Sequence, residues 1–144
     1  GEFRKYVKIG INNILALRVF AGYINNLETD NDLPEGYKFK LGGQTSLRGW
    51  ASPDKFEVPS GSLISDMINL EYRFPIWKKI GGELFIDAGR LYETIDAITN
   101  TSISWDYGVG ATYQTALGPI RIDIGFPYGE LSKSQLHASL LYMF

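Results

Sequence analysis

Apolar and polar residues alternate along most of this chain of 144 residues, and the pattern restricts its fold more than any other feature of the sequence. Successive side chains of a β-strand point to opposite faces, so sustained alternation predicts strands with one apolar and one polar face. With their flanking residues, the alternating segments correspond to strands of about 9–11 residues. There are seven of them: 6–11, 15–23, 67–74, 83–89, 104–114, 120–126 and 136–144. We therefore expect one all-β, antiparallel domain over residues 1–144.

Composition supports this assignment and excludes several classes of function. Aromatic residues make up 14% of the chain and glycine occurs 16 times, which suits strands and turns better than helices. The net charge of −2 provides no basic surface for nucleic acid. The absence of cysteine excludes a disulfide scaffold and a thiolate metal site. No run approaches the ~20 consecutive apolar residues of a membrane-spanning helix, but strands that cross a membrane do not produce such a run.

The two faces of the predicted strands favour contact with lipid over contact with a protein core. Alternation alone does not distinguish a membrane barrel from a soluble one, so a soluble ligand-binding barrel is an alternative. The polar face is rich in glycine, serine, threonine and charged residues, as the interior of a membrane barrel requires. Aromatic residues lie near both ends of the apolar face, as they do at the two membrane interfaces. They are Tyr23, Tyr92, Trp105, Tyr107 and Phe126 near one rim and Phe74, Tyr113, Tyr142 and Phe144 near the other.

The lengths of the connections also indicate an outer-membrane β-barrel. The predicted turns Asn12–Asn13, Pro75–Gly81 and Ala116–Gly118 are short, whereas the connections at the opposite end are long. Short periplasmic turns and long extracellular loops are typical of such barrels. Seven strands leave two unpaired edges, and unpaired backbone groups in hydrocarbon cost several kcal/mol each. We therefore expect closure by an eighth strand, by strands upstream of Gly1, or by self-association of the chain as a homo-oligomer.

The longest connection, residues 25–63, contains a glycine-rich motif. Loops longer than about 12–15 residues are uncommon in compact domains unless they are functional or disordered, and this one carries too many apolar residues to be disordered. The glycines predict a tight backbone that holds the arginine and the tryptophan in fixed directions. The motif residues are Gly42, Gly43, Leu47, Arg48, Gly49 and Trp50. We interpret the loop as a folded plug or latch with Arg48 at its tip; an ordinary glycine-rich surface turn fits the residues alone equally well.

Two carboxylates on the predicted polar face are candidate partners of Arg48. Glu71 and Asp87 lie on either side of a short turn and share a face, so we expect them to be neighbours. Neighbouring carboxylates that are partly removed from water repel each other unless a cation lies between them, and a guanidinium group suits two carboxylates. The alternative is that both are solvated and pair with Arg73 or Arg18. The charged or titratable residues of the polar face are Lys8, Arg18, Glu71, Arg73, Glu83, Asp87, Asp106, Arg121, Asp123 and His137.

Several motifs together resemble the bacterial surface antigen superfamily, the BamA/TamA-like outer-membrane assembly factors. The residues from Gly42 to Trp50 are similar to its signature of an aliphatic residue, arginine, glycine and an aromatic residue. The similarity continues, in the family's order, at residues 70–75, 85–89 and 118–123 and at the terminal Phe144. It covers nearly the whole chain but only the C-terminal part of the family's barrel, about seven to eight strands. The upstream strands and the periplasmic POTRA domains of the family are therefore not expected in this segment.

The resemblance implies a location, an activity and a role for Arg48. The long loop would be extracellular and would fold into the barrel lumen, where Arg48 would contact Glu71 and Asp87. The chain would lie in outer-membrane lipid, bacterial or organellar, and would promote insertion or secretion of client β-barrel or secreted polypeptides, without a cofactor. The mechanism implied is strand templating at a seam with local thinning of the bilayer. A structural or pore-forming outer-membrane barrel of the same fold, without insertase activity, is the alternative.

The last strand has a second implied role. Its apolar face ends in Leu140, Tyr142 and Phe144, the type of aromatic terminus that outer-membrane assembly machinery recognises, and in the family this strand forms one side of the seam. An anchor at the membrane interface is the alternative.

We expect neither catalysis nor a metal site. His137 is the only histidine, no serine can be placed beside it, and no Gly-x-Ser-x-Gly motif occurs. With one histidine, no cysteine and scattered carboxylates, the sequence contains no metal-ligand set and no phosphate-binding loop.

Overall fold

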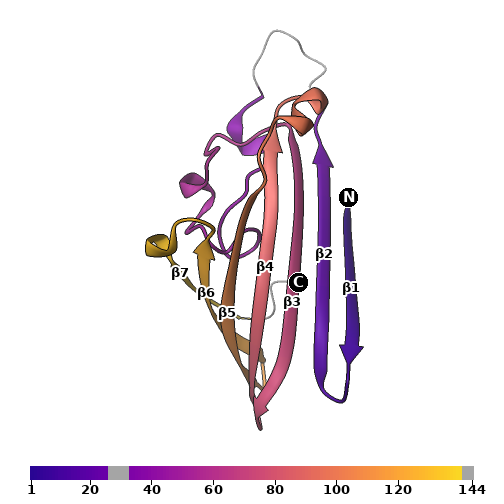
Figure 1. Cartoon of the computed structure of the whole chain (residues 1–144), viewed down its shortest axis with the longest axis vertical. Coiled ribbons are helices and arrows are strands. Elements are labelled where there is room, and N and C mark those ends of the chain that lie inside the picture. Colours follow the sequence, from indigo (N-terminus) through magenta and orange to yellow (C-terminus); the bar gives the residue numbers. More distant parts are fainter. Residues whose placement is uncertain (26–32, 141–144) are drawn as a thin grey trace.

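The described part of the chain forms one antiparallel sheet in which each strand pairs with the next along the sequence (Figure 1). The computed structural model describes residues 1–25 and 33–140. Its seven strands are β1 (Glu2–Ile9), β2 (Asn13–Tyr23), β3 (Ile64–Trp77), β4 (Ile80–Tyr92), β5 (Ser104–Thr115), β6 (Gly118–Pro127) and β7 (Gln135–Leu140). Four short 3₁₀ helices lie in the connections: η1 (Glu35–Tyr37), η2 (Pro53–Lys55), η3 (Ile95–Thr99) and η4 (Leu131–Lys133). Over these residues no helix has the length and apolar character needed to cross a membrane. The predicted all-β, antiparallel fold is confirmed.

The two faces of the sheet differ as the alternation predicted. On the apolar face, Ile86 and Ile122 each keep 50% of their surface exposed. On the polar face, Glu71 and Asp87 are fully buried. A sheet with charged residues inside and aliphatic residues outside is the reverse of a water-soluble sandwich, and it is the arrangement that lipid around the sheet requires.

The sheet does not close on itself over the described residues. β1 pairs with β2 alone and β7 with β6 alone, so each has one edge without a neighbouring strand. All eight residues of β1 are exposed. Such edges offer unpaired N–H and C=O groups to another strand. How the sheet is completed therefore stays a prediction.

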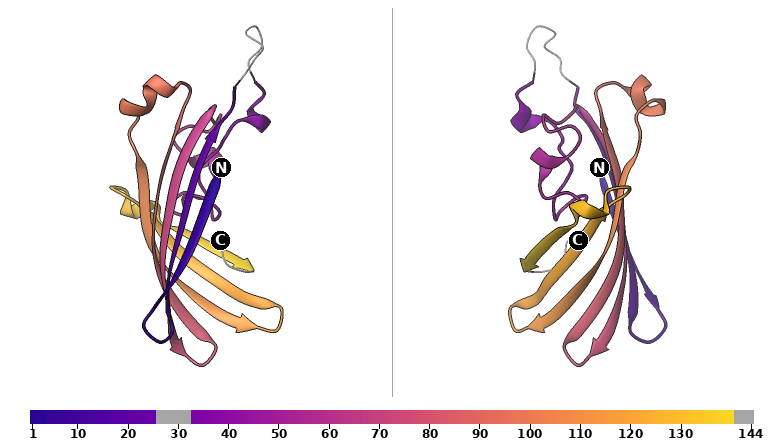
Figure 2. Two further views of the ribbon diagram at one scale, coloured as in Figure 1. Left: turned by 90° about the vertical axis from the view of Figure 1, so that its right-hand side faces the viewer. Right: turned by 60° about the vertical axis from the view of Figure 1, so that its left-hand side comes forward.

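The described part of the long loop, residues 33–63, lies against one face of the sheet (Figure 2). A bridge between Phe39 and Ser62 brings its two limbs together, with both backbone hydrogen bonds at 2.9 Å. An apolar cluster, the only one of its kind among the described residues, joins the loop to the sheet. Its buried members are Leu41, Leu47 and Phe56 from the loop and Met67 and Leu91 from β3 and β4. The loop is therefore a packed part of the fold and not an ordinary surface turn.

Two of the predicted turns differ from those in the structure. The first turn is residues 10–12 and not Asn12–Asn13: Gly10 has φ +67° and begins it, and Ile9 pairs with Asn13. The ladder between β3 and β4 continues past Pro75, so the predicted turn Pro75–Gly81 is wrong. A proline is tolerated there because the pairing becomes irregular directly after it, at a β-bulge.

Asp66 and Arg90 interrupt the apolar face at the end where the connections are long. They are paired across β3 and β4, and Arg90 Nε lies 2.9 Å from Asp66 Oδ2. The Tyr92 hydroxyl group donates to the same carboxylate at 3.2 Å, and Arg90 Nη1 donates to the carbonyl group of Ile98 at 2.7 Å. Both charges are thus compensated, which makes their place on this face tolerable.

Candidate functional site

The glycines of the loop motif shape a compact backbone turn. Gly42 and Gly43 have φ values of +106° and +90°, a region that favours glycine. A side chain on Gly42 would also come within 2.8 Å of the carbonyl oxygen of Ser52. The N–H of Gly43 donates to the carbonyl group of Trp50 at 2.9 Å, which closes the motif, and the N–H of Gly42 donates to Ser46 Oγ at 2.8 Å. The motif is therefore a rigid, closed loop in which the backbone at Gly43 and the backbone at Trp50 lie next to each other.

Apolar contacts hold this turn on the sheet. Leu47 is fully buried in the cluster between loop and sheet. Trp50 packs edge-on against Phe56, with ring centroids 5.1 Å apart. Since Leu47 directly precedes Arg48, its burial sets where the arginine enters the polar face.

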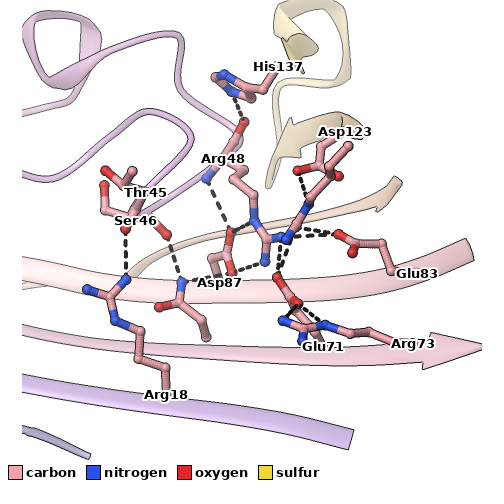
Figure 3. Close-up of polar contacts among 12 residues, drawn as sticks. Arg18, Thr45, Ser46, Arg48, Glu71, Arg73, Glu83, Asp87, Asp123 and His137 are labelled. Carbon is pink, nitrogen blue, oxygen red and sulfur yellow. Dashed lines mark hydrogen bonds and ion pairs between the residues drawn. The ribbon is translucent and has the colours of Figure 1, made fainter. Parts of the chain in front are cut away.

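Arg48 is fully buried and binds the two predicted carboxylates (Figure 3). Its Nε and Nη2 each donate to Asp87, to Oδ2 and Oδ1 respectively, both at 2.7 Å. The backbone N–H of Arg48 donates to Asp87 Oδ2 at 3.2 Å. Nη1 donates to Glu71 Oε1 at 2.6 Å. This two-point contact with Asp87 is one that a lysine cannot reproduce.

Arg73 was the alternative partner of Glu71, and it binds Glu71 in addition to Arg48. Arg73 Nε donates to Glu71 Oε2 at 2.8 Å, while Arg48 uses Oε1. Arg18, the other alternative, donates instead to Glu2 Oε2 at 2.9 Å and to the carbonyl group of Thr45 at 2.8 Å. Glu71 is thus a shared acceptor on the sheet, and Arg18 supports the loop backbone from β2.

A second buried arginine belongs to the same network, although the sequence did not identify it as a partner. Arg121 Nη2 lies 2.9 Å from Glu71 Oε1, the oxygen that also accepts from Arg48. Arg121 also contacts Glu83, and its Nε donates to Asp123 at 2.6 Å. Glu83 in turn lies 3.4 Å from Arg48 Nη1. The site therefore joins the loop to β3, β4 and β6.

Strand register brings these residues together. Glu83 and Asp123 both pair with Gly110 of β5, one on each side. A side chain at Gly110 would come within 2.2 Å of Asp123 Oδ1 and 2.7 Å of Glu83 Cγ, so glycine leaves the space in which they approach. Alternation placed these residues on the polar face, but their lateral alignment depends on register, which the sequence pattern does not specify.

Phe85 is a second contact that the sequence analysis missed. The guanidinium carbon of Arg48 lies 3.5 Å from the centroid of the Phe85 ring, and the ring is buried. A cation over an aromatic face is attracted by the ring, most strongly when water is excluded. Gly108, which pairs with Phe85, leaves room for the ring, since a side chain there would lie 2.3 Å from Phe85 Cζ. The sequence feature that could have indicated this contact is the aromatic side chain of Phe85 on a face that is otherwise mostly polar.

Polar residues around the motif complete its attachment. Asn69 Nδ2 donates to the carbonyl group of Ser46 at 2.7 Å and to Asp87 Oδ1 at 2.9 Å. His137 Nε2 donates to the carbonyl oxygen of Arg48 at 2.9 Å. Gly49 lies so close to Asp106 that a side chain at Gly49 would be 2.5 Å from Asp106 Cβ. His137 is thus a hydrogen-bonding residue of the loop contact.

The buried charges depend on one another. Three guanidinium groups, of Arg48, Arg73 and Arg121, contact the buried carboxylate of Glu71. Burial acts to lower the pKa of Arg48, but the carboxylates of Asp87 and Glu71 outweigh it and raise that pKa above its ordinary value. Arg48 is therefore charged at every pH at which the protein is folded.

The residues predicted for the end of the last strand lie only partly within the described part of the chain. Leu140 lies on the apolar face and is 71% exposed, whereas Tyr142 and Phe144 lie outside the described residues.

In the part of the chain that the structure describes, no group of three or more histidine, cysteine, aspartate or glutamate residues is arranged to hold a metal ion.

The fold and site together define a class of protein: a segment of outer-membrane β-barrel wall with a folded loop fastened to its polar face. The chain belongs to the Omp85 superfamily, because the model of the Omp85 superfamily domain matches residues 1–136. It is accordingly an outer-membrane protein, and its resemblance to the C-terminal barrel part of the BamA/TamA-like family is confirmed.

Two relatives illustrate the match. The outer membrane protein assembly factor BamA of Nitratidesulfovibrio vulgaris is 28% identical over 152 residues, which cover 95% of this chain. The chain spans only 18% of the length of that protein. The crystal structure of BamA from Haemophilus ducreyi lacking POTRA domains 1–3 has the same fold, with a TM-score of 0.70 and 17% identity, over 94% of this chain and 32% of that one.

Proposed function

We propose that this chain is part of the barrel of an outer-membrane assembly factor that promotes insertion or secretion of client β-barrel or secreted polypeptides. The observation that carries the proposal is Arg48, fully buried between the long loop and the carboxylates of Glu71 and Asp87. A relative with the same fold region is named as an assembly factor for outer-membrane proteins. In this role the contacts of Arg48 hold the loop at one position on the polar face, and they stabilise a single conformation of the barrel wall.

The unpaired strand edges support a templating mechanism. Over the described residues, β1 and β7 each have one backbone edge without a neighbouring strand. An incoming client strand gains main-chain hydrogen bonds at such an edge, which is β-augmentation. The bond from His137 of β7 to Arg48 places the loop motif beside the strand that forms one of these edges. No cofactor takes part in this mechanism.

The test is a client-folding assay with the protein in its full native length. The protein is reconstituted in liposomes, and folding of an unfolded outer-membrane barrel is followed by its heat-modified gel mobility. We expect faster client folding than in empty liposomes, and a loss of most of this acceleration in Arg48→Ala. A protein that conducts ions across the bilayer but leaves client folding unchanged would support the alternative, a structural or pore-forming barrel.

A further inference from the structure

The hairpin between β3 and β4 ends in a turn with two exposed apolar residues followed by two lysines. Ile76 and Trp77 are 59% and 62% exposed, and Lys78 and Lys79 form the turn itself. Figure 1 shows that this hairpin extends beyond the other hairpins at the same end of the sheet. Large apolar side chains at the tip of a hairpin are costly in water, so this tip is suited to a less polar environment.

A β-bulge turns Trp77 onto the apolar face. Pro75 pairs with Gly81 but Trp77 pairs with Ile80, so Ile76 is an extra residue on β3. Paired residues share a face, and Trp77 therefore faces the same side as Ile80. Without the extra residue, alternation would direct Trp77 to the polar face. The local irregularity thus presents a tryptophan where the sheet meets lipid.

Lys78 is held next to this tryptophan in an unusual conformation. Its φ of +49° makes it the only described non-glycine residue with a positive φ. Its Nζ lies 4.4 Å from the centroid of the Trp77 ring. Left-handed backbone at a residue other than glycine is strained and often marks a functional position. The turn presents an amphipathic ring and an ammonium group side by side.

The whole short-turn end of the sheet is basic. Residues 8–14, 72–82 and 112–120, which form the three hairpin ends, contain no aspartate or glutamate. They contain Lys8, Arg73, Lys78 and Lys79, of which Arg73 pairs with Glu71. The chain as a whole has a net charge of −2, so the positive charge at this end is a local feature. The tips of the other two hairpins carry Ile11 and Leu117, each 91% exposed.

We propose that the β3–β4 turn, residues 76–80, binds the headgroups of anionic phospholipids in the leaflet on the short-turn side. Trp77 would lie at the boundary between acyl chains and headgroups, and Lys78 and Lys79 would contact the lipid phosphate. Tryptophan favours that boundary, and lysines near an anionic leaflet attract its headgroups. The inference rests on the placement of the apolar face against lipid, and it adds a lipid preference that the client-folding proposal does not require.

The test compares lipid selectivity in the full-length protein reconstituted in vesicles. Quenching of tryptophan fluorescence by brominated phosphatidylglycerol is measured against brominated phosphatidylcholine at equal mole fraction. Trp77→Phe identifies the contribution of this residue. The variant Lys78→Gln/Lys79→Gln is compared with Lys38→Gln/Lys55→Gln, which removes the same charge from two lysines of the long loop, Lys38 half-buried and Lys55 exposed. Heat-modified gel mobility checks that every variant is folded.

We expect phosphatidylglycerol to quench Trp77 more strongly than phosphatidylcholine does. The preference should fall about fivefold for each lysine removed from the turn and should stay unchanged in the long-loop variant. Equal quenching by both lipids in the unmodified protein, or an unchanged preference without Lys78 and Lys79, would overturn the proposal. The proposal would also be overturned if Lys78→Gln/Lys79→Gln lost client folding while the protein showed no lipid preference. That result would assign the turn to a protein partner. The effect of Arg48→Ala on client folding is separate from all of these outcomes.

Discussion

His137 and Arg48 are joined by a hydrogen bond of 2.9 Å although they are 89 positions apart in the sequence. The acceptor is the backbone carbonyl group of Arg48, so the bond fixes the main chain of the loop motif to β7, while the side chain is fixed to β3 and β4. Gly125 of β6 allows this approach, because a side chain there would lie 2.4 Å from the same carbonyl oxygen. The loop motif is thereby attached to β7 through its backbone and to β3 and β4 through the side chain of Arg48.

Removing the charge of Arg48 should release the long loop. Arg48→Ala leaves Asp87 buried without its cation, while Glu71 keeps Arg73 and Arg121, and we expect a loss of about 3–5 kcal/mol in the free energy of unfolding. Arg48→Lys should restore only part of it, because an ammonium group cannot bind Asp87 at two points. Loop cleavage by protease and heat-modified gel mobility measure the effect. Lys55→Ala, at an exposed loop position, is the control. If both Arg48 variants match the unmodified protein in these assays, the latch interpretation is wrong.

The bond from His137 should matter for the position of the loop more than for stability. His137→Phe removes one hydrogen bond, a loss of about 1 kcal/mol. We expect protease cleavage of residues 33–63 to become about fivefold faster, with the sheet still folded by circular dichroism. Ser139→Ala, on the same face of β7, should leave cleavage unchanged. Equal cleavage of the His137 variant and the unmodified protein would show that the attachment to β7 is dispensable.

A side chain at Gly125 should displace the loop motif. The added Cβ of Gly125→Ala would meet the carbonyl group of Arg48 at 2.4 Å, and backbone atoms cannot move aside as a flexible side chain can. We expect a loss of about 1–3 kcal/mol and faster cleavage of the loop. Gly36→Ala is the matched control, since nothing lies within 4 Å of a Cβ at that position. Similar behaviour of the two variants would contradict the close contact.

The two buried arginines should be energetically coupled. Arg48 and Arg121 both donate to Glu71 Oε1, so loss of one changes the environment of the other. A double-mutant cycle with Arg48→Leu and Arg121→Leu should deviate from additivity by about 0.5–3 kcal/mol, measured by unfolding in urea. Arg48→Leu with Arg90→Leu serves as the control pair, because Arg90 lies on the apolar face and pairs with Asp66. Additivity within error for the first pair would mean that the shared carboxylate does not couple them.

Much of the fold could be read from residue order alone because side-chain direction in a strand has a period of two. Ile86 and Ile122 on one face and Glu71 and Asp87 on the other were all placed correctly by alternation. Errors occurred where the period is broken. The ladder continues through Pro75 because a bulge follows it, and a bulge leaves little trace in a pattern of apolar and polar residues.

The partners in the site were only partly accessible from the sequence. Glu71 and Asp87 were found because they lie on consecutive strands, where a short turn limits the register. Arg121 reaches Glu71 from β6, 50 positions further along the chain, and this contact depends on strand curvature and on the space left by Gly110. The role of Phe85 likewise required the position of the guanidinium group to be known.

The sequence by itself determined which residues share each face of the sheet, and it identified Arg48 as a candidate cation for Glu71 and Asp87. Local periodicity is enough for the first, and the repulsion between two neighbouring carboxylates that are partly removed from water indicated the second. Only the tertiary structure decided that Arg121, Phe85 and His137 complete the site. Their contacts join distant parts of the chain through register, sheet curvature and loop packing, and none of these is encoded in a short stretch of residues.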